Sequence, residues 1–450
     1  MNTLIRTDRL PALLLGIALL AGCGLLDTQQ PNVIDPNTLK TPQGAEGLRL
    51  GAIADFAFAK DGDGTTSQDG LILTAGLLSD EFILSTTPPS EQEIDLRTTA
   101  LINPGLSDVY FNLHKARAGA DQAAEYLQLY LVTPDESPEI AEMQSLAGFA
   151  DLYFGEDFCS GVPFSRVSGD STIFGQPQTT QQMFEAALAK FDSALAHPGL
   201  SQDDGTITNL ALVGRARALL DLGRFDEAAD AASTVPLDFQ YVTEHNDAPL
   251  QLQNAIWVYT NQGLWSVADQ EGGAGLPYIT AGDPRVPVDT LDSDGDGFAD
   301  FGLDSQTLQW ALFKYPDANA SVPVADGIEA RLIVAEAQLQ NGDRGGMTAT
   351  LNNLRSTAID PALPNLAIPG NDAAAADLLF SERAFWLYAT GHRLGDMRRL
   401  IRQYLRPADS VFPTGDYHKG GATYGSDVNL PIPIEEENNP NGGVCLDRNA

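Results

Sequence analysis

The 450-residue sequence is poor in basic residues, and this shortage excludes some partners. It contains 26 Lys and Arg against 61 Asp and Glu, which gives a formal net charge of −35. Nucleic acid and anionic lipid would repel such an acidic chain, so we exclude both as direct partners. Strong acidity is compatible with a domain held outside the cell or with one that meets divalent cations. A need for solubility alone also explains it.

Sequence signatures of common enzyme classes are missing as well. The chain has no His-Glu-x-x-His zinc motif, no phosphate loop ending in Gly-Lys-Ser/Thr and no Gly-x-Ser-x-Gly nucleophile elbow. Its five histidines are scattered, and no pair among its 61 acidic residues is singled out for glycoside cleavage. We therefore predict a protein that is not an enzyme and that requires no cofactor.

The N-terminal segment has the pattern of a secretion signal. Arg6 and Arg9 precede an apolar run at residues 10–22, which is too short to span a bilayer. A basic start followed by a short apolar run predicts a signal peptide over residues 1–22.

The end of that segment matches a bacterial lipobox, Leu-Ala-Gly-Cys, with the cysteine at position 23. Small residues fit the cleavage site, and the Cys23 thiol would accept diacylglycerol. Several acyl chains on one residue anchor a soluble domain stably. Gly24 stands where Asp would favour retention in the inner membrane, so we expect the outer membrane. Residues 23–41 would then be a lipidated tether. The alternative is an ordinary secretion signal with a chance cysteine.

Cysteine is scarce, and only Cys159 and Cys445 remain beside Cys23. In an oxidising compartment two thiols predict one disulfide. The bridge would close a loop of 445 − 159 = 286 residues. Chain entropy assigns roughly 5 kcal/mol to a loop of that length.

Helical periodicity dominates residues 107–235 and 328–402. Residues 209–234 resemble one tetratricopeptide repeat, with Gly223 at the turn between two helices. A related pair spans residues 328–356. Stacked helix pairs share one continuous core, so we predict a mainly α fold with a tetratricopeptide-like helical-repeat scaffold and little β-structure.

Three other segments lack this periodicity. Residues 236–326 interrupt the helix pairs with about 90 residues rich in Gly, Pro, Asp and aromatics. A structureless loop of that length is uncommon in a compact domain, so we predict an insertion with short strands and small helices. We expect a loop at residues 85–101 and a coil tail at residues 407–450.

The densest group of arginine, aromatic and acidic residues lies at residues 377–402. The pattern predicts a helix that ends at Gly391, because glycine adopts the left-handed conformation at little cost, and then a second short helix. Charges this close to aromatic rings predict half-buried ion pairs, for example Glu382 or Asp396 with an arginine. The alternative is that the arginines face water.

This stretch also resembles a known signature. The segments 382–383 (ER), 390–393 (TGHR) and 396–399 (DMRR) are similar to the "ER…EGHR…DLRR" signature of SusD/RagB-like nutrient-uptake lipoproteins. Residues 314–316 (KYP) and the following 329–337 (EARLIVAEA) are similar to a second segment of that family.

The resemblance implies one SusD-like domain over residues 42–450. Members of that family cap a TonB-dependent, SusC-like transporter in the outer membrane and help to deliver glycans or other nutrients. We therefore expect a cell-surface lipoprotein that binds a glycan or an oligopeptide. The alternative is a tetratricopeptide-type structural or assembly lipoprotein, in which the long aromatic insertion would have no role.

Aromatic residues in or beside the insertion are candidate ligand contacts. Aromatic faces bind the apolar faces of sugar rings, and the family builds its ligand platform from loops of this region. The alternative for each residue is core packing. The candidates are Trp257, Tyr259, Trp265, Tyr278 and Trp310.

An Asp-rich segment at residues 292–300 resembles the start of a calcium loop. Such loops bind Ca²⁺ through acidic side chains at alternate positions and a backbone carbonyl, and a glycine forms the sharp turn. Position 12 of the loop is Leu303 where an EF-hand has Glu, so the motif is incomplete. The alternative is a solvated acidic turn. The predicted Ca²⁺ ligands are Asp292, Asp294, Asp296, Phe298 and Asp300.

Overall fold

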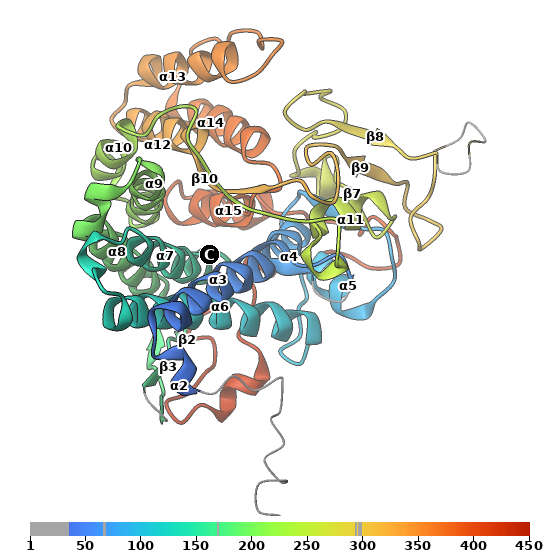
Figure 1. The fold of residues 1–450 in the computed structure, drawn as a ribbon. Helices are drawn as coiled ribbons and strands as arrows, with labels where there is room; N and C mark the ends of the chain where they lie inside the picture. The colour runs from blue at the N-terminus through green and yellow to red at the C-terminus, as the bar shows by residue number, and fades with distance from the viewer. Residues whose placement is uncertain (1–35, 66–68, 169–170, 293–294, 296–298) are drawn as a thin grey trace, which may run out of the picture.

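The computed structural model describes residues 36–65, 69–168, 171–292, 295 and 299–450. Most of these residues are helical, and the strands are short (Figure 1). Within these ranges no helix is both long enough and apolar enough to cross a membrane. The signal peptide and Cys23 lie outside the described residues, so both stay predictions.

The scaffold is an arc of helices in which each packs on its neighbours in the chain. In Figure 1 the arc runs from α6 and α7 through α9 and α10 to α12 and α13. This arrangement confirms the predicted mainly α, repeat-like fold. The helices of the scaffold are α3 (Pro42–Asp61), α6 (Pro104–Tyr130), α7 (Glu139–Asp157), α8 (Thr180–Leu195), α9 (Thr206–Asp221), α10 (Phe225–Ser233), α12 (Gly327–Gln340) and α13 (Arg344–Thr357).

The helix pair α9–α10 shows why small residues are needed between helices. Gly223 joins the two helices with a φ of +72°, a conformation that residues with a side chain rarely adopt. On α9, a Cβ atom on Gly214 would lie 2.2 Å from the Phe191 ring of α8. The repeat predicted at residues 209–234 is therefore a true antiparallel pair with close contacts on both sides.

The insertion begins and ends in one antiparallel strand pair. Strand β6 (Gln240–Thr243) pairs with β10 (Val322–Asp326), immediately before α12. Short strands and small helices lie between them, as the composition predicts. One of these strands, β7 (Trp265–Val267), pairs with β1 (Phe82–Leu84). This pair attaches the insertion to the N-terminal part of the scaffold. The elements between are α11 (Ala255–Asn261), β7 (Trp265–Val267), β8 (Val288–Thr290) and β9 (Trp310–Leu312).

Residues 85–101 correct one prediction. The expected loop contains the short helix α5 (Pro89–Asp95), which begins at a proline and carries Glu91 in its first turn. Proline and an acidic residue both favour a helix start. The helix has only two turns and buries one apolar side chain, Ile94, so it has too few apolar positions to show a period.

The predicted helix end at Gly391 is also displaced. Helix α14 (Asp372–Trp386) ends earlier, and α15 (Arg393–Arg402) follows. The connecting carbonyl groups find donors elsewhere in the fold: Lys314 donates to the carbonyl of Tyr388 at 2.7 Å, and the Tyr315 hydroxyl donates to the carbonyl of Ala389 at 2.8 Å. Because these carbonyl groups already accept hydrogen bonds, the helix can end before Gly391 without leaving them unpaired.

The acidic residues of this region form the ion pairs that the sequence predicts, and they are buried. Arg383 Nε lies 2.7 Å from Asp396 Oδ2, and Arg399 contacts the same carboxylate at 2.7 Å. Glu382 pairs with Arg285 at 2.7 Å and with Arg355 at 2.6 Å. Residues 382–399 therefore lie in the centre of the scaffold and do not face water.

The tail is tied to the scaffold by the predicted disulfide between Cys159 and Cys445. Cys159 follows α7, and Cys445 follows the 3-10 helix η6 (Ile434–Asn438). The backbone N–H of Leu446 also donates to the carbonyl of Ser160 at 2.7 Å. These links hold the tail beside α6 and the hairpin of β3 (Arg166–Ser168) and β4 (Ser171–Ile173).

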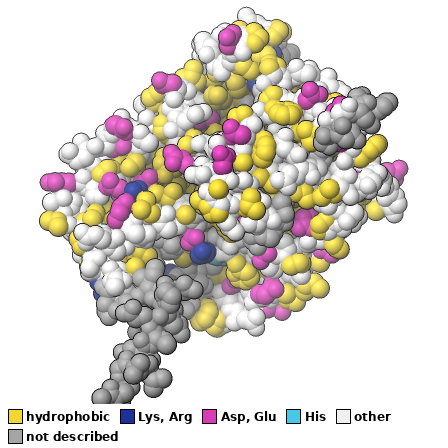
Figure 2. Space-filling model, turned by 45° about the vertical axis from the view of Figure 1, so that its right-hand side comes forward, with side chains coloured by type: hydrophobic (Ala, Val, Ile, Leu, Met, Phe, Trp, Pro, Cys, Tyr) yellow, Lys and Arg dark blue, Asp and Glu magenta, His cyan; other side chains and the backbone are white. Residues whose placement is uncertain are grey.

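The surface is predominantly acidic. Figure 2 shows Asp and Glu side chains spread over the visible face, with few Lys or Arg among them. The sequence counts agree, and many of the arginines are used inside the scaffold. A cationic group at the surface is therefore uncommon in this protein.

Candidate functional site

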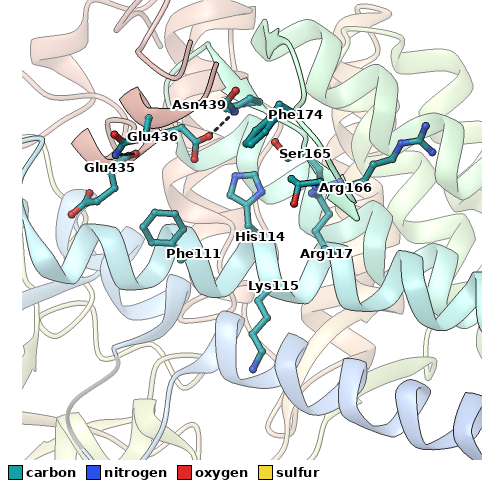
Figure 3. A pocket seen from close by; sticks show the side chains of 14 residues that line it. Phe111, His114, Lys115, Arg117, Ser165, Arg166, Phe174, Glu435, Glu436 and Asn439 are labelled. Atoms are coloured by element: carbon teal, nitrogen blue, oxygen red, sulfur yellow. Dashed lines mark hydrogen bonds between the residues drawn. The ribbon is translucent and has the colours of Figure 1, made fainter. Parts of the chain in front are cut away.

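A hollow of about 470 Å³ lies between the first half of α6, the β3–β4 hairpin and η6 (Figure 3). Three segments far apart in the sequence form it, and the disulfide holds two of them together. A hollow with apolar surface and a few polar groups is the usual form of a small-molecule site. Its lining residues are Phe111, His114, Lys115, Arg117, Ala118, Pro163, Ser165, Arg166, Thr172, Phe174, Glu435, Glu436, Asn438 and Asn439.

Two phenylalanine rings give the pocket an apolar surface. Phe111 on α6 is 43% exposed, and Phe174 after β4 is 46% exposed. Asn441 in the tail fixes the second ring's backbone by donating to the carbonyl of Phe174 at 2.8 Å. Exposed aromatic rings gain free energy when a ligand covers them. The pair therefore favours a ligand with an apolar face.

His114 lies between these rings and supplies an unsatisfied polar group (Figure 3). Its ring packs against Phe154 and Tyr110, with centroid distances of 4.3 and 4.6 Å. Its Nε2 atom is buried and has no hydrogen-bond partner among the described residues. Burial, and then the charge of Arg117, lower the pKa of His114 well below 6.5. The neutral imidazole can donate to or accept from a ligand hydroxyl.

Charged and amide groups surround the apolar surface. Arg117 lies over the Phe164 ring at 4.9 Å and donates to the carbonyl of Ser165. On the opposite side, Glu436 accepts from the Asn439 amide at 2.9 Å. Partial burial raises the pKa of Glu436. The arrangement offers donors and acceptors around two aromatic faces, which suits a ligand that carries several hydroxyl groups.

No protein-family model matches the sequence, and no curated protein matches it. Solved structures do match. A SusD superfamily protein from Bacteroides thetaiotaomicron superposes with a TM-score of 0.66 at 15% identity, covering 90% of this chain and 100% of that chain. A SusD-like carbohydrate binding protein from Bacteroides fragilis gives 0.64 at 16% identity, covering 90% and 99%. Surface glycan-binding protein A from Bacteroides uniformis gives 0.63 at 13% identity, covering 88% and 97%.

The chain has the SusD-like fold. The match extends over the scaffold and the insertion together, since nine-tenths of the chain is covered. The resemblance noted at residues 382–399 thus falls on the buried ion pairs that hold α14 and α15 in the SusD-like scaffold.

Three of the predicted ligand contacts belong to the core of this SusD-like domain. Tyr259, Trp265 and Tyr278 are between 0% and 2% exposed. The first two pack against each other at 5.4 Å, and Tyr278 packs against Tyr388 at 4.7 Å. A ring that is covered on both faces cannot contact a ligand, so the prediction is wrong for these three. Trp257 and Trp310 are half-buried at the edge of the core and stay predictions.

The calcium loop lies mostly outside the described residues, including Asp294, Asp296 and Phe298. Asp292 is exposed, and Asp300 is half-buried. The described ranges contain no cluster of three or more His, Cys, Asp or Glu side chains that could hold a metal ion. Calcium binding stays a prediction.

Sequence reasoning did not identify the pocket residues, although α6 contained a signal. The apolar face of that helix includes Leu113 and Ala116, which are buried. Phe111 and His114 lie three residues apart off that face, so their rings adjoin on the helix, and an adjoining group of exposed rings can mark a binding surface where a single ring does not. Phe174 and Glu436 line the pocket only because the fold brings distant segments together, so no local sequence pattern identifies them as pocket residues.

Proposed function

We propose that this protein is a non-enzymatic, cell-surface carbohydrate-binding lipoprotein and that the pocket beside α6 holds its ligand. One observation carries the proposal: two exposed phenylalanine rings flank a neutral histidine whose buried nitrogen has no hydrogen-bond partner in the part of the chain that the structure describes. Sugar rings present an apolar face of C–H groups and an edge of hydroxyl groups. The rings of Phe111 and Phe174 suit the first, and His114 suits the second.

The SusD-like fold supports this choice of ligand. Two structures with this fold are named as carbohydrate-binding or glycan-binding proteins. A plain assembly scaffold would have no need of such a pocket. An oligopeptide is the second ligand class that the sequence resemblance implies.

The proposal includes a place and a partner. Acyl chains on Cys23 would anchor the acidic domain to the outer membrane, facing the medium. There it would cap a TonB-dependent, SusC-like transporter and release its cargo into the barrel without breaking a bond. The lipobox and the fold support this part of the proposal. Recovery of a TonB-dependent barrel with the native lipoprotein from membranes would test it.

Binding to a panel of polysaccharides tests the ligand class. We expect at least one polysaccharide to bind, and the double variant Phe111→Ala/Phe174→Ala to lower its affinity by about tenfold or more, as loss of buried aromatic contacts does. The matched control is Leu129→Ala, an exposed apolar residue of α6 outside the pocket.

Three outcomes would contradict the proposal. The first is no binding to any polysaccharide, and the second is cleavage of the bound polysaccharide. The third is a loss of affinity in Trp257→Ala and Trp310→Ala with none in the phenylalanine variant, which would move the site to the insertion.

A further inference from the structure

A second hollow, of about 690 Å³, adjoins the pocket along α6. The two hollows share Lys115, Ala118 and Arg166, so they meet at these three residues. We call the first the aromatic compartment and the second the polar compartment. The remaining residues that line the polar compartment are Asp55, Gly119, Asp121, Gln122 and Glu125.

One stripe of α6 connects the compartments. Phe111, Lys115, Ala118, Gln122 and Glu125 are spaced by alternate steps of four and three residues, which places them on one side of the helix. From Phe111 to Glu125 the stripe advances by 125 − 111 = 14 residues, which is about 21 Å at the helical rise of about 1.5 Å per residue. A monosaccharide is much shorter than this stripe, whereas a chain of several sugar units can follow it.

Ion pairs fix the sides of the polar compartment. Lys115 Nζ lies 2.8 Å from Asp55 Oδ1, which joins α6 to α3. Asp121 is held by Lys190 of α8 at 2.6 Å. These contacts pair the charges of Lys115, Asp55 and Asp121 within the protein, which leaves the other polar side chains of the compartment for a ligand.

Three exposed polar side chains in the compartment remain available. Gln122, Glu125 and Arg166 have no side-chain hydrogen bond or ion pair to any described residue. An amide, a carboxylate and a guanidinium group together offer donors and acceptors for hydroxyl groups. None of the described residues that line the polar compartment is aromatic, so it suits sugar units bound by their hydroxyl edges.

We propose that the ligand is an extended oligosaccharide that lies across Ala118, with one unit against Phe111 and Phe174 and the next units in the polar compartment. This inference rests on the proposed function. Ala118 would determine the specificity for chain length, because its small, half-buried side chain lies where the two hollows share their lining. A larger side chain at position 118 fills the junction of the two compartments, since Ala118 lines both of them.

Calorimetric titration with oligosaccharides of defined length tests this inference. The probes are malto-, cello-, xylo- and galacturono-oligosaccharides from disaccharide to octasaccharide. In a series that binds the wild-type protein, we expect affinity to rise with length. The variant Ala118→Leu should lower the affinity for the octasaccharide by about tenfold, equivalent to about 1.4 kcal/mol, and should affect the disaccharide much less. Alanine and leucine both favour helices, so α6 should form normally.

Two further variants complete the test. Gln128→Leu places the same side chain on an exposed α6 position outside both compartments and should match the wild type with every probe. Gln122→Ala removes the amide without adding volume and should weaken only the longer probes.

The outcomes separate this inference from the function on which it rests. Equal affinities for the disaccharide and the octasaccharide would overturn the extended ligand and leave carbohydrate binding in place. Wild-type length dependence in both Ala118→Leu and Gln122→Ala would show that the further sugar units bind outside the polar compartment, and would overturn this inference. Failure of all four series and of the polysaccharide panel would overturn the proposed function and this inference together.

Discussion

At the residue scale, the stability of the scaffold depends on charged side chains that have no access to water. Arg383, Arg399, Asp396 and Glu336 are all buried, and each has at least one partner of opposite charge. A buried charge is tolerated only when ion pairs and hydrogen bonds replace its water shell. Removing one partner therefore costs more than the pair itself contributes, since the other charge remains buried.

We expect Arg383→Ala to destabilise the protein by about 3–5 kcal/mol, because Asp396 loses two of its hydrogen bonds inside the core. Urea unfolding measures the change. The matched control is Arg344→Ala, whose pair with Asp372 at 3.2 Å is exposed and should contribute less than about 1 kcal/mol. Equal losses in the two variants would contradict the role given to the buried pairs.

The same residues show how far a sequence predicts such pairs. The density of charges predicts that Asp396 meets an arginine, and two arginines nearby in the sequence supply the partners. Glu382 also pairs as expected, but Arg285 comes from the insertion, and only the fold brings it there. The sequence does not distinguish an aromatic residue in the core from one in a pocket. Whether Trp265 is buried and Phe111 is exposed is decided by distant segments that pack against them.

At the element scale, the C-terminal tail forms part of the pocket beside α6. Helix η6 contributes Glu435 and Glu436 to the pocket, and Cys445 ties the following residues to Cys159. The two cysteines predict this link from the sequence, since no other partner remains for either. That this link also holds η6 against the pocket could not be predicted from the cysteine count, because it depends on the hairpin that follows Cys159.

We expect Cys445→Ser to lower stability and ligand affinity together. Loss of a long-range disulfide costs about 2–5 kcal/mol, and the tail also becomes free to leave the pocket. Urea unfolding measures the first effect, and titration with the polysaccharide that binds best measures the second. The wild-type protein after reduction should behave like the variant. Unchanged affinity in both samples would show that η6 does not support the site.

At the scale of the whole molecule, negative charge is present both on the surface and inside. The formal net charge is −35, and several carboxyl groups are buried as well. Burial raises the pKa of Glu81 to about 8, with further effects from the Ala389 N–H, which lowers it, and from Asp80, which raises it. Burial likewise raises the pKa of Asp157 and Glu329 to about 7. Such groups are protonated more readily in the folded chain than in the unfolded chain.

This difference predicts that the protein loses stability as the pH rises from 4.5 towards 8. Between the ordinary Glu pKa of 4.5 and the folded value of about 8, the folded state binds more protons than the unfolded state. The stabilisation that this group contributes is therefore complete below pH 4.5, and it is lost as the pH rises to about 8. Acidic groups with a lowered pKa, such as Asp304 at about 2, lose their contribution only at lower pH. The lowered pKa of His114 and His392 opposes the decline up to pH 6.5, but the buried carboxyl groups with a raised pKa outnumber these histidines.

Thermal unfolding across this pH range, in enough salt to screen the surface charges, measures the decline. The variant Glu81→Gln isolates one group, because the amide stays neutral at every pH and keeps an oxygen for the Ala389 N–H, which lies 2.8 Å from Glu81 Oε1. Its melting temperature should fall less than that of the wild type between pH 4.5 and pH 8, and the two curves should converge at the acidic end. A wild-type melting temperature that rises with pH, or a variant with the full decline, would show that Glu81 is ionised in the fold and that its charge is compensated by Arg393 and Lys314.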